Sequence, residues 1–292
     1  MPQLSKLIDK TNCFLADTSL LDKYLPKKSL RRVDHFARMA LLAAAKSIED
    51  ADTKYFSKKD TGVIIATGFG ALKTTFAFLD SYIEKSDKLS SPTHFSNSVH
   101  NAAAAHVSRI FGITGPNLTI SQFDMSFFSA LITAQSWLAT KKVNTVLLGT
   151  SDAFCDVLKY CIDNFSDLKG AKEYSFGEGS AFFLLTRETE RPKYGSFENI
   201  SMGNYYHNSL DIPKNTELIV SPSSINPCND EFLNYIKDHG NTRYRKRLFS
   251  PTDCGMDVFF SAKIKQKICY IKIGQCGEYG KMIIAPDFES CK

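Results

Sequence analysis

Three short apolar runs constrain the fold of this chain more than any other feature of its sequence. They are Thr61–Ala66, Val143–Gly149 and Ser180–Thr186, and each is rich in β-branched, leucine or phenylalanine side chains. Strands that are apolar throughout are typical of the centre of a sheet that is covered on both faces. Stretches with helical spacing of apolar residues, such as Val33–Ile48 and Ser126–Thr140, lie before and between them. This alternation predicts an α/β fold with buried central strands.

The other predicted elements continue this alternation. In the first half we expect two more helices and a further strand, at Leu72–Ile83, Asn101–Phe111 and Leu118–Ser121. The polar stretch Ser86–Asn97 contains Pro92 and is predicted to be a loop. In the second half the pattern is weaker and predicts three strands and two helices, at Glu217–Val220, Ile268–Ile273, Met282–Ala285, Asp230–Asp238 and Val258–Lys265.

The composition is that of a soluble globular protein. The chain has 292 residues, of which 43% are hydrophobic and 23% are charged, enough for a sizeable core. Its longest apolar stretch, near Met39–Ala45, is too short to cross a bilayer, and Met1–Thr11 does not have the pattern of a signal segment. We therefore expect a cytoplasmic protein with no membrane partner.

The cysteines and histidines do not have the spacing of metal ligands. None of the eight cysteines forms a C-x-x-C pair: Cys13, Cys155, Cys161, Cys228, Cys254, Cys269, Cys276 and Cys291. His100 and His106 are six residues apart, so they do not share one face of a helix. We expect neither a metal site nor a cofactor, and we expect these histidines to serve the core or an interface.

The net charge of +5 includes two local basic clusters, formed by Lys27, Lys28, Arg31 and Arg32 and by Arg243, Arg245, Lys246 and Arg247. Each cluster is either a solvated face or a docking surface for an acidic partner, because clustered positive charge steers anionic surfaces. No helix-turn-helix, zinc-finger or aromatic-basic motif accompanies these clusters, so nucleic acid is not an expected partner.

The most informative pattern lies between Ser91 and Ala153. It begins SPTHFSNSVHNAAAAH, continues through GPNLTI, and ends in the strand that carries Gly149 and Asp152. This ordered series resembles the β-ketoacyl synthase family. Ser175–Ser180 (SFGEGS) and Ile273–Ala285 resemble the family's later glycine turns. The resemblance implies a thiolase-like layered α/β fold, with central mixed sheets and helices between and outside them. It also implies one compact unit, with a ketosynthase-like half at 1–190 and a shortened second half at 191–292.

The resemblance places Asp124 where the family has its nucleophilic cysteine. A cysteine between a strand and the N-terminus of a helix becomes a thiolate, because the helix dipole stabilises negative charge there. Here that segment reads QFDMSF. A carboxylate is a much poorer acceptor of an acyl group from a thioester. We expect Asp124 to be a helix N-cap; a role in acid–base or decarboxylation chemistry is the alternative.

The two histidines of the family's active site are also missing from the positions that match. With Asn229-Asp230 aligned to the family's N-D pair, the first histidine position is Pro222, and the second falls at Pro251. Proline has neither a titratable group nor a backbone N–H. Catalytic groups act as a unit, so the loss of all three implies a protein that is no longer a condensing enzyme.

A family member without these groups resembles the chain length factors. The resemblance implies a non-catalytic subunit that pairs with an active β-ketoacyl-ACP synthase, or with itself, and shapes the acyl tunnel in polyketide, fatty-acid or aryl-polyene biosynthesis. An acyl carrier protein is then a further partner. Two alternatives stay open. The chain is an independent acyl-thioester decarboxylase or hydrolase that uses Asp124, or it is a scaffold or regulator that binds no acyl chain.

The same resemblance assigns residues to the tunnel and to the interface. Three aromatic residues are expected to line the acyl tunnel: Phe69, Phe123 and Phe127. His94, Phe95 and Val99 match a segment that reaches across the dimer. The predicted strand formed by Asn117, Leu118, Thr119, Ile120 and Ser121 is expected to pair antiparallel with its equivalent in the partner, because an edge strand needs such a neighbour.

Overall fold

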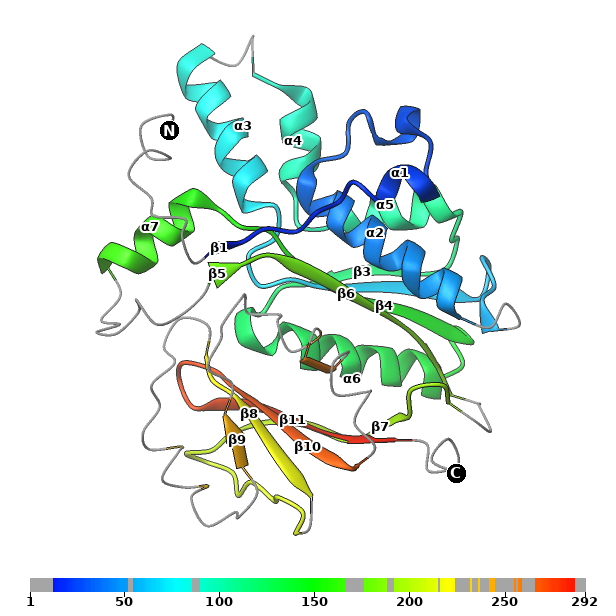
Figure 1. Cartoon of the computed structure of the whole chain (residues 1–292), viewed down its shortest axis with the longest axis vertical. Helices are drawn as coiled ribbons and strands as arrows, with labels where there is room; N and C mark the ends of the chain where they lie inside the picture. The colour runs from blue at the N-terminus through cyan, green and yellow to red at the C-terminus, as the bar shows by residue number, and fades with distance from the viewer. Residues whose placement is uncertain are drawn as a thin grey trace.

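Two β-sheets with the helix α6 (Ser126–Ala139) between them form the framework of the molecule, as the computed structural model in Figure 1 shows. The structure describes residues 13–51, 55–85, 90–165, 176–187, 192–214, 216–223, 232, 236, 242–244, 255, 257–258 and 266–286. The layered α/β architecture with mixed sheets that the sequence predicts is confirmed.

The first sheet has the strand order β3-β2-β4-β6. Its strands are β3 (Asn117–Ile120), β2 (Thr61–Ala66), β4 (Thr145–Asp152) and β6 (Gly179–Thr186). The first three are parallel, and β6 runs antiparallel to β4. Every residue of β2 and β4 is buried, as the continuous apolar runs predict, and β3 lies at the edge of the sheet.

Helices cover both faces of this sheet. On one face lie α2 (His35–Asp50) and α5 (Ala102–Phe111), and on the other lies α6. Side chains of β2 alternate between the two: Val63 and Ile65 pack into the α2/α5 cluster, whereas Ile64 and Ala66 pack with α6. The period of two residues in a strand thus divides one apolar run between two cores.

The second sheet has the order β7-β11-β10-β8-β9. Its strands are β7 (Ser196–Asn204), β11 (Glu278–Ala285), β10 (Ile268–Ile273), β8 (Glu217–Ser221) and β9 (Thr242–Tyr244). In β10, Ile268 and Tyr270 pack against α6, and Cys269, Ile271 and Ile273 pack into a cluster on the outer face. By the same alternation Lys272 belongs to the inner face, which carries the site described below.

The remaining elements lie around these layers. They are the short parallel pair β1 (Cys13–Phe14) and β5 (Phe176–Gly177), the helices α1 (Leu21–Tyr24), α3 (Leu72–Lys85), α4 (Pro92–Ser98) and α7 (Asp156–Phe165), and the 3₁₀ turns η2 (Lys27–Leu30) and η5 (Phe123–Met125). The helices α3 and α4 stand side by side at one end of the molecule (Figure 1). None of the helices in the described part of the chain is both long and apolar enough to cross a membrane.

Two sequence-based expectations differ from this structure. The predicted loop at Ser86–Asn97 is wrong where it is described, because helix α4 begins at Pro92. Ser91 is its N-cap and accepts a hydrogen bond from the His94 amide, and Pro92 occupies the first helical position, which tolerates proline. Strand β7 was not expected from its mixed polarity. The predicted helices at Asp230–Asp238 and Val258–Lys265 fall almost entirely outside the described residues.

Candidate functional site

Asp124 lies at the junction that the sequence assigns to the nucleophile. Strand β3 leads through the turn η5 into α6, and Asp124 is the middle residue of η5. It is only 3% exposed, although it is an ionisable residue next to the surface strand β3. The position is therefore part of the interior, and its carboxylate needs partners there.

Those partners come from β10 of the second sheet and from the residues that follow β8. The Oγ of Ser223 donates a hydrogen bond to Asp124 Oδ2 at 2.7 Å. The Nζ of Lys272 lies 3.5 Å from Asp124 Oδ1, and the Lys272 side chain is completely buried. Lys272 Nζ also lies 3.4 Å from Ser221 Oγ, to which it donates. A buried ion pair with hydroxyl groups on both sides thus occupies the place of the expected nucleophile.

The register of the second sheet brings Lys272 to this place. Lys272 is paired with Ser221 of β8 on one side and with Gly280 of β11 on the other. The ring of Phe128, from α6, occupies the space that a side chain at position 280 would need. Helix α6 and the inner face of the sheet are therefore closely apposed here, and the end of β10 lies against η5.

The expectation that Asp124 is a helix N-cap is wrong. Helix α6 begins at Ser126, its N-cap position is Met125, and no side chain caps it. The carboxylate of Asp124 is drawn to Lys272 and Ser223 instead, because a buried cation attracts it more strongly than a backbone amide does.

Of the two positions expected for histidines, one is described. Pro222 follows β8 directly and lies between Ser221 and Ser223, the two serines that contact the ion pair. The position aligned with a family histidine is thus adjacent to Asp124 in space. Pro251 lies outside the described residues.

The three expected tunnel residues are only partly brought together. The rings of Phe69 and Phe123 meet edge to face, with centroids 5.9 Å apart. Phe127 is buried between the sheets, where its ring faces Phe128 and Phe183. Phe69 and Phe123 form one aromatic surface, and Phe127 belongs to the core.

A buried carboxylate holds the turn that carries Phe69. Asp152, at the end of β4, accepts hydrogen bonds from the amides of Gly68 and Phe69 and from the hydroxyl of Thr67. The backbone at Gly70 has a positive φ of 62°, which suits glycine. Asp152 therefore holds the turn of Phe69 in place, and we assign it no role in acid–base chemistry.

A second buried carboxylate, Glu178, fastens the glycine turn before β6. His35 Nε2 donates to Glu178 Oε1 at 2.6 Å, and the amides of Ala16 and Phe154 donate to the same carboxylate. Burial acts to raise the pKa of Glu178, but these hydrogen bonds outweigh it and leave the pKa below its ordinary value. Glu178 is thus a structural carboxylate.

The residues assigned to the interface lie at the surface. His94, Phe95 and Val99 are exposed on α4 and just after it, and Phe95 is 59% exposed. In and just after the edge strand β3, Asn117, Leu118 and Ser121 are exposed, and Thr119 and Ile120 are half-buried. Between Arg109 and Lys141 the sequence has one charged residue, the buried Asp124. The surface that this segment contributes is therefore uncharged.

The cysteines and histidines in the described part of the chain do not form an alternative site. Burial raises the pKa of the Cys155 thiol, and it raises the pKa of the Cys269 thiol to about 11, so both are neutral and poor nucleophiles. His106 bonds to the amide oxygen of Asn97 through Nε2. Within the described residues, no three His, Cys, Asp or Glu side chains lie where they could hold a metal ion.

Sequence reasoning missed Lys272. The signal that could have found it is a lysine in the apolar run ICYIKI, on the same strand face as Ile268 and Tyr270. A cation on the buried face of a strand requires a counter-charge. Its partner could not be named from sequence, because Asp124 lies in the turn η5, Lys272 lies in β10 of the second sheet, and the two are far apart along the chain.

Comparison with known proteins agrees with the resemblance found in the sequence. A family model described as Beta-ketoacyl synthase, N-terminal domain, matches residues 2–191. The chain is 28% identical over 102 residues to 3-oxoacyl-[acyl-carrier-protein] synthase 2 of Vibrio cholerae. That match covers 34% of this chain and 25% of the curated relative, so the chain aligns with about a quarter of that protein.

Two solved structures share the fold. "The ishigamide ketosynthase/chain length factor" is 14% identical with a TM-score of 0.76, over 94% of this chain and 86% of that one. A type II PKS acyl-carrier protein in complex with its ketosynthase (AntDE:AntF) is 12% identical with a TM-score of 0.71, over 98% and 93% of the two chains. Because the family model covers more than half of a chain that folds in this way, the protein belongs to the β-ketoacyl synthase family.

Proposed function

We propose that this protein is a non-catalytic subunit of the chain-length-factor type. It pairs with an active β-ketoacyl-ACP synthase and helps to shape the acyl tunnel in polyketide, fatty-acid or aryl-polyene assembly. The observation that carries this proposal is the buried Asp124–Lys272 pair at the junction where a condensing enzyme has its thiolate. A carboxylate held in this way is neither a thioester nucleophile nor in reach of solvent.

The same geometry weighs against an independent decarboxylase or hydrolase. Such an enzyme needs the Asp124 carboxylate to contact an acyl thioester. Both carboxylate oxygens are engaged, one by Ser223 and one by Lys272, and the residue is 3% exposed. No observation on the described residues favours this second activity.

The edge strand β3 supports the proposal of an interface with the partner subunit. The carbonyls of Pro116 and Ile120 accept hydrogen bonds from the amides of Val63 in β2 and of Thr67 just after it. The backbone groups of Thr119, which alternate with them, therefore point to the open edge. The segment 110–140, whose one charged residue is the buried Asp124, continues from this edge into α6. Charged residues are depleted in the core of protein interfaces, and a second sheet edge would complete the pairing.

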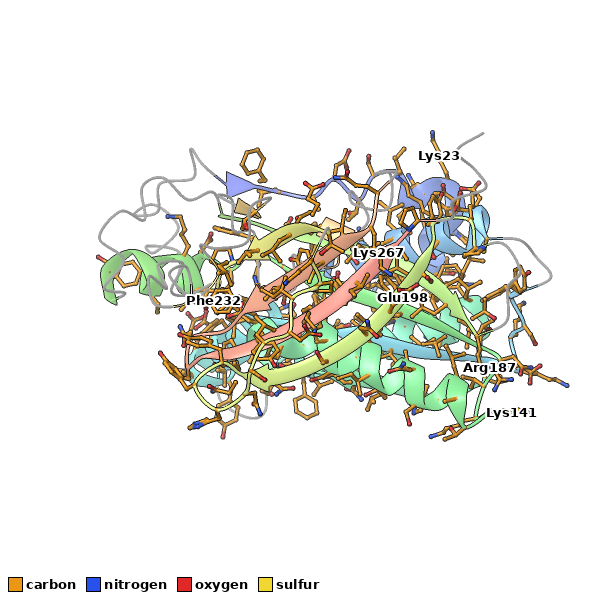
Figure 2. The ribbon with its side chains drawn as sticks, turned by 90° about the horizontal axis from the view of Figure 1, so that it is seen from below. Lys23, Lys141, Arg187, Glu198, Phe232 and Lys267 are labelled. Atoms are coloured by element: carbon orange, nitrogen blue, oxygen red, sulfur yellow. The ribbon has the colours of Figure 1, made fainter. Side chains whose placement is uncertain are left out.

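A basic surface offers a place for the carrier protein. Five exposed cations come from α1, from η2 and from the residues just after η2, with Asp22 as the one acidic residue among them: Lys23, Lys27, Lys28, Arg31 and Arg32. Lys23 is labelled at one corner of the molecule in Figure 2. One of the related structures holds an acyl-carrier protein on its ketosynthase. An acidic carrier protein is the partner that this charge would attract.

The experiment that tests the proposal is co-expression with a cysteine-bearing ketosynthase and a carrier protein from the same genome, followed by mass spectrometry of the carrier-bound product. We expect product only when this chain is present. Phe69→Ala is expected to lengthen the product, and Tyr206→Ala, at an aromatic residue 58% exposed on the second half of the chain, to leave it unchanged.

Two results would contradict the proposal. One is formation of the same product by the ketosynthase without this chain. The other is turnover of acyl thioesters by the isolated chain that Asp124→Asn abolishes, since that result would establish the decarboxylase or hydrolase alternative.

A further inference from the structure

Phe123 is held in a backbone conformation that phenylalanine rarely adopts. Its φ is +44°, in the left-handed region that glycine tolerates and bulky residues avoid. The residue is nevertheless 54% exposed, so core packing does not offset the strain. Strain of this kind persists only where the surroundings enforce it, and it points to a function for the residue.

Buried groups on both sides of Phe123 enforce the turn. On one side, Ser126 Oγ accepts from the Gln122 amide and donates to the Phe123 carbonyl, each at 2.7 Å. Ser126 itself is fully buried. On the other side, Asp124 is drawn inward by Lys272 and Ser223. With both neighbours anchored, the Phe123 side chain has no path into the core.

The ring that results is supported from behind and surrounded by an uncharged surface. Phe69 meets it edge to face at 5.9 Å, and the turn of Phe69 is itself held by Asp152. Ser121 and Gln122, which link Phe123 to the open edge of β3, are exposed and neutral. A rigid aromatic ring in such a setting is typical of an interface anchor.

We propose that the buried Asp124–Lys272 pair is a positioning device that holds Phe123 in its strained turn and thereby presents its ring, supported by Phe69, to the partner subunit. The inference rests on the proposed function, because it takes the partner to be an active ketosynthase of the same fold. Asp124, which stands at the position of the nucleophile, would then orient the adjacent Phe123 toward the partner.

The first test compares Phe123→Ala with Phe123→Gly. Both variants remove the ring, and each is expected to weaken association with the ketosynthase roughly tenfold or more in a titration. Glycine also relieves the strain. We therefore expect Phe123→Gly to melt roughly 2–4 °C above Phe123→Ala, with unfolding followed by the fluorescence of Trp137, the one tryptophan.

The second test asks whether the ion pair holds the turn. Asp124→Asn/Lys272→Met removes both charges, so no buried ion is left alone. In this double variant, Phe123→Gly should melt less far above Phe123→Ala than it does in the wild-type background. With Phe123 kept, the double variant should bind the ketosynthase as weakly as Phe123→Ala does. The matched control is Glu198→Gln/Lys267→Met, a half-exposed ion pair of 2.8 Å between β7 and the residue before β10 (Figure 2). It should change neither the melting difference nor the association.

The outcomes separate the two proposals. If the wild-type chain does not bind the ketosynthase, the proposed function fails, and with it the partner assigned here. If the wild-type chain binds and Phe123→Ala binds equally well, only the present inference is overturned. An equal melting difference between alanine and glycine in both backgrounds would show that Asp124 and Lys272 do not position Phe123.

Discussion

Asp124 and Lys272 are two buried charged residues, and each requires the other to compensate its charge. Each has lost nearly all contact with water, and the desolvation of one ion costs several kcal/mol unless an opposite charge and hydrogen bonds replace the water. Ser221 and Ser223 supply those hydrogen bonds. The pair therefore behaves as one unit. Replacing one of the two residues should destabilise the protein more than replacing both.

We predict that Lys272→Met lowers the free energy of unfolding by about 3 kcal/mol, because it leaves the Asp124 carboxylate buried without its cation. Urea unfolding followed by the fluorescence of Trp137 measures this change. Lys267→Met removes a lysine that is 41% exposed, and its cost should stay below about 1 kcal/mol. If Lys272→Met and Lys267→Met destabilised the protein equally, burial of the Asp124–Lys272 pair would not be the cause of the larger expected loss.

A pH dependence follows from Glu178. Because its folded-state pKa lies below its unfolded value, its hydrogen bonds stabilise the protein fully above the unfolded pKa of about 4.3, and this stabilisation is lost as the pH falls through the folded value. The wild-type protein should thus lose more stability between pH 5 and pH 3 than Glu178→Gln does. Urea midpoints at both pH values test this prediction, and parallel losses in the two proteins would refute it.

At the scale of elements, the helix α4 depends on its first residues. It is short, it consists of polar residues apart from Pro92 and Phe95, and it receives little from helix propensity. Its start is specified by the N-cap Ser91 and by Pro92 at the first position, and the ring of Phe95 packs against Phe78 of α3. Local capping and one tertiary contact together make a helix where polarity alone predicts a loop.

We expect Ser91→Ala to cost about 1 kcal/mol, the usual cost of losing a serine N-cap. Ser96→Ala is the matched control, since Ser96 lies within the same helix and its hydroxyl donates only to the Thr93 carbonyl. Hydrogen exchange of the α4 amides is the appropriate measurement, because it resolves local opening. If both variants exchange alike, the cap does not determine the start of α4.

At the scale of the whole molecule, the open edge of β3 is the feature that calls for a second subunit. Among the residues that the structure describes, this strand is paired on one side only, and the segment from 110 to 140 carries no charge apart from the buried Asp124. A long neutral surface next to an unpaired edge invites association. Expressed alone, the chain should be poorly soluble or should self-associate, and a stable soluble monomer in gel filtration would count against this view.

Thr119→Pro tests the edge directly. Proline removes an N–H that points to the open edge and leaves the bonds between β3 and β2 intact. Association with the ketosynthase should therefore fail while the chain keeps its fold by circular dichroism. Leu118→Pro provides the contrast, because its amide faces β2 and its loss should unfold the edge of the sheet. Unchanged association of Thr119→Pro would place the interface elsewhere.

The sequence by itself determined the layered architecture and the absence of a thiolate at the junction. Continuous apolar runs such as Thr61–Ala66 have one stable environment, the centre of a covered sheet, and the ordered motifs from Ser91 to Ala153 locate Asp124 before α6. Only the tertiary structure decided what Asp124 contacts. Its partner Lys272 is selected by the register of β10 in the other sheet, and a charge buried by distant chain segments leaves no local pattern to find. The strained turn of Phe123 is decided in the same way, because it follows from that pair and from the hydroxyl of Ser126 rather than from its own propensity.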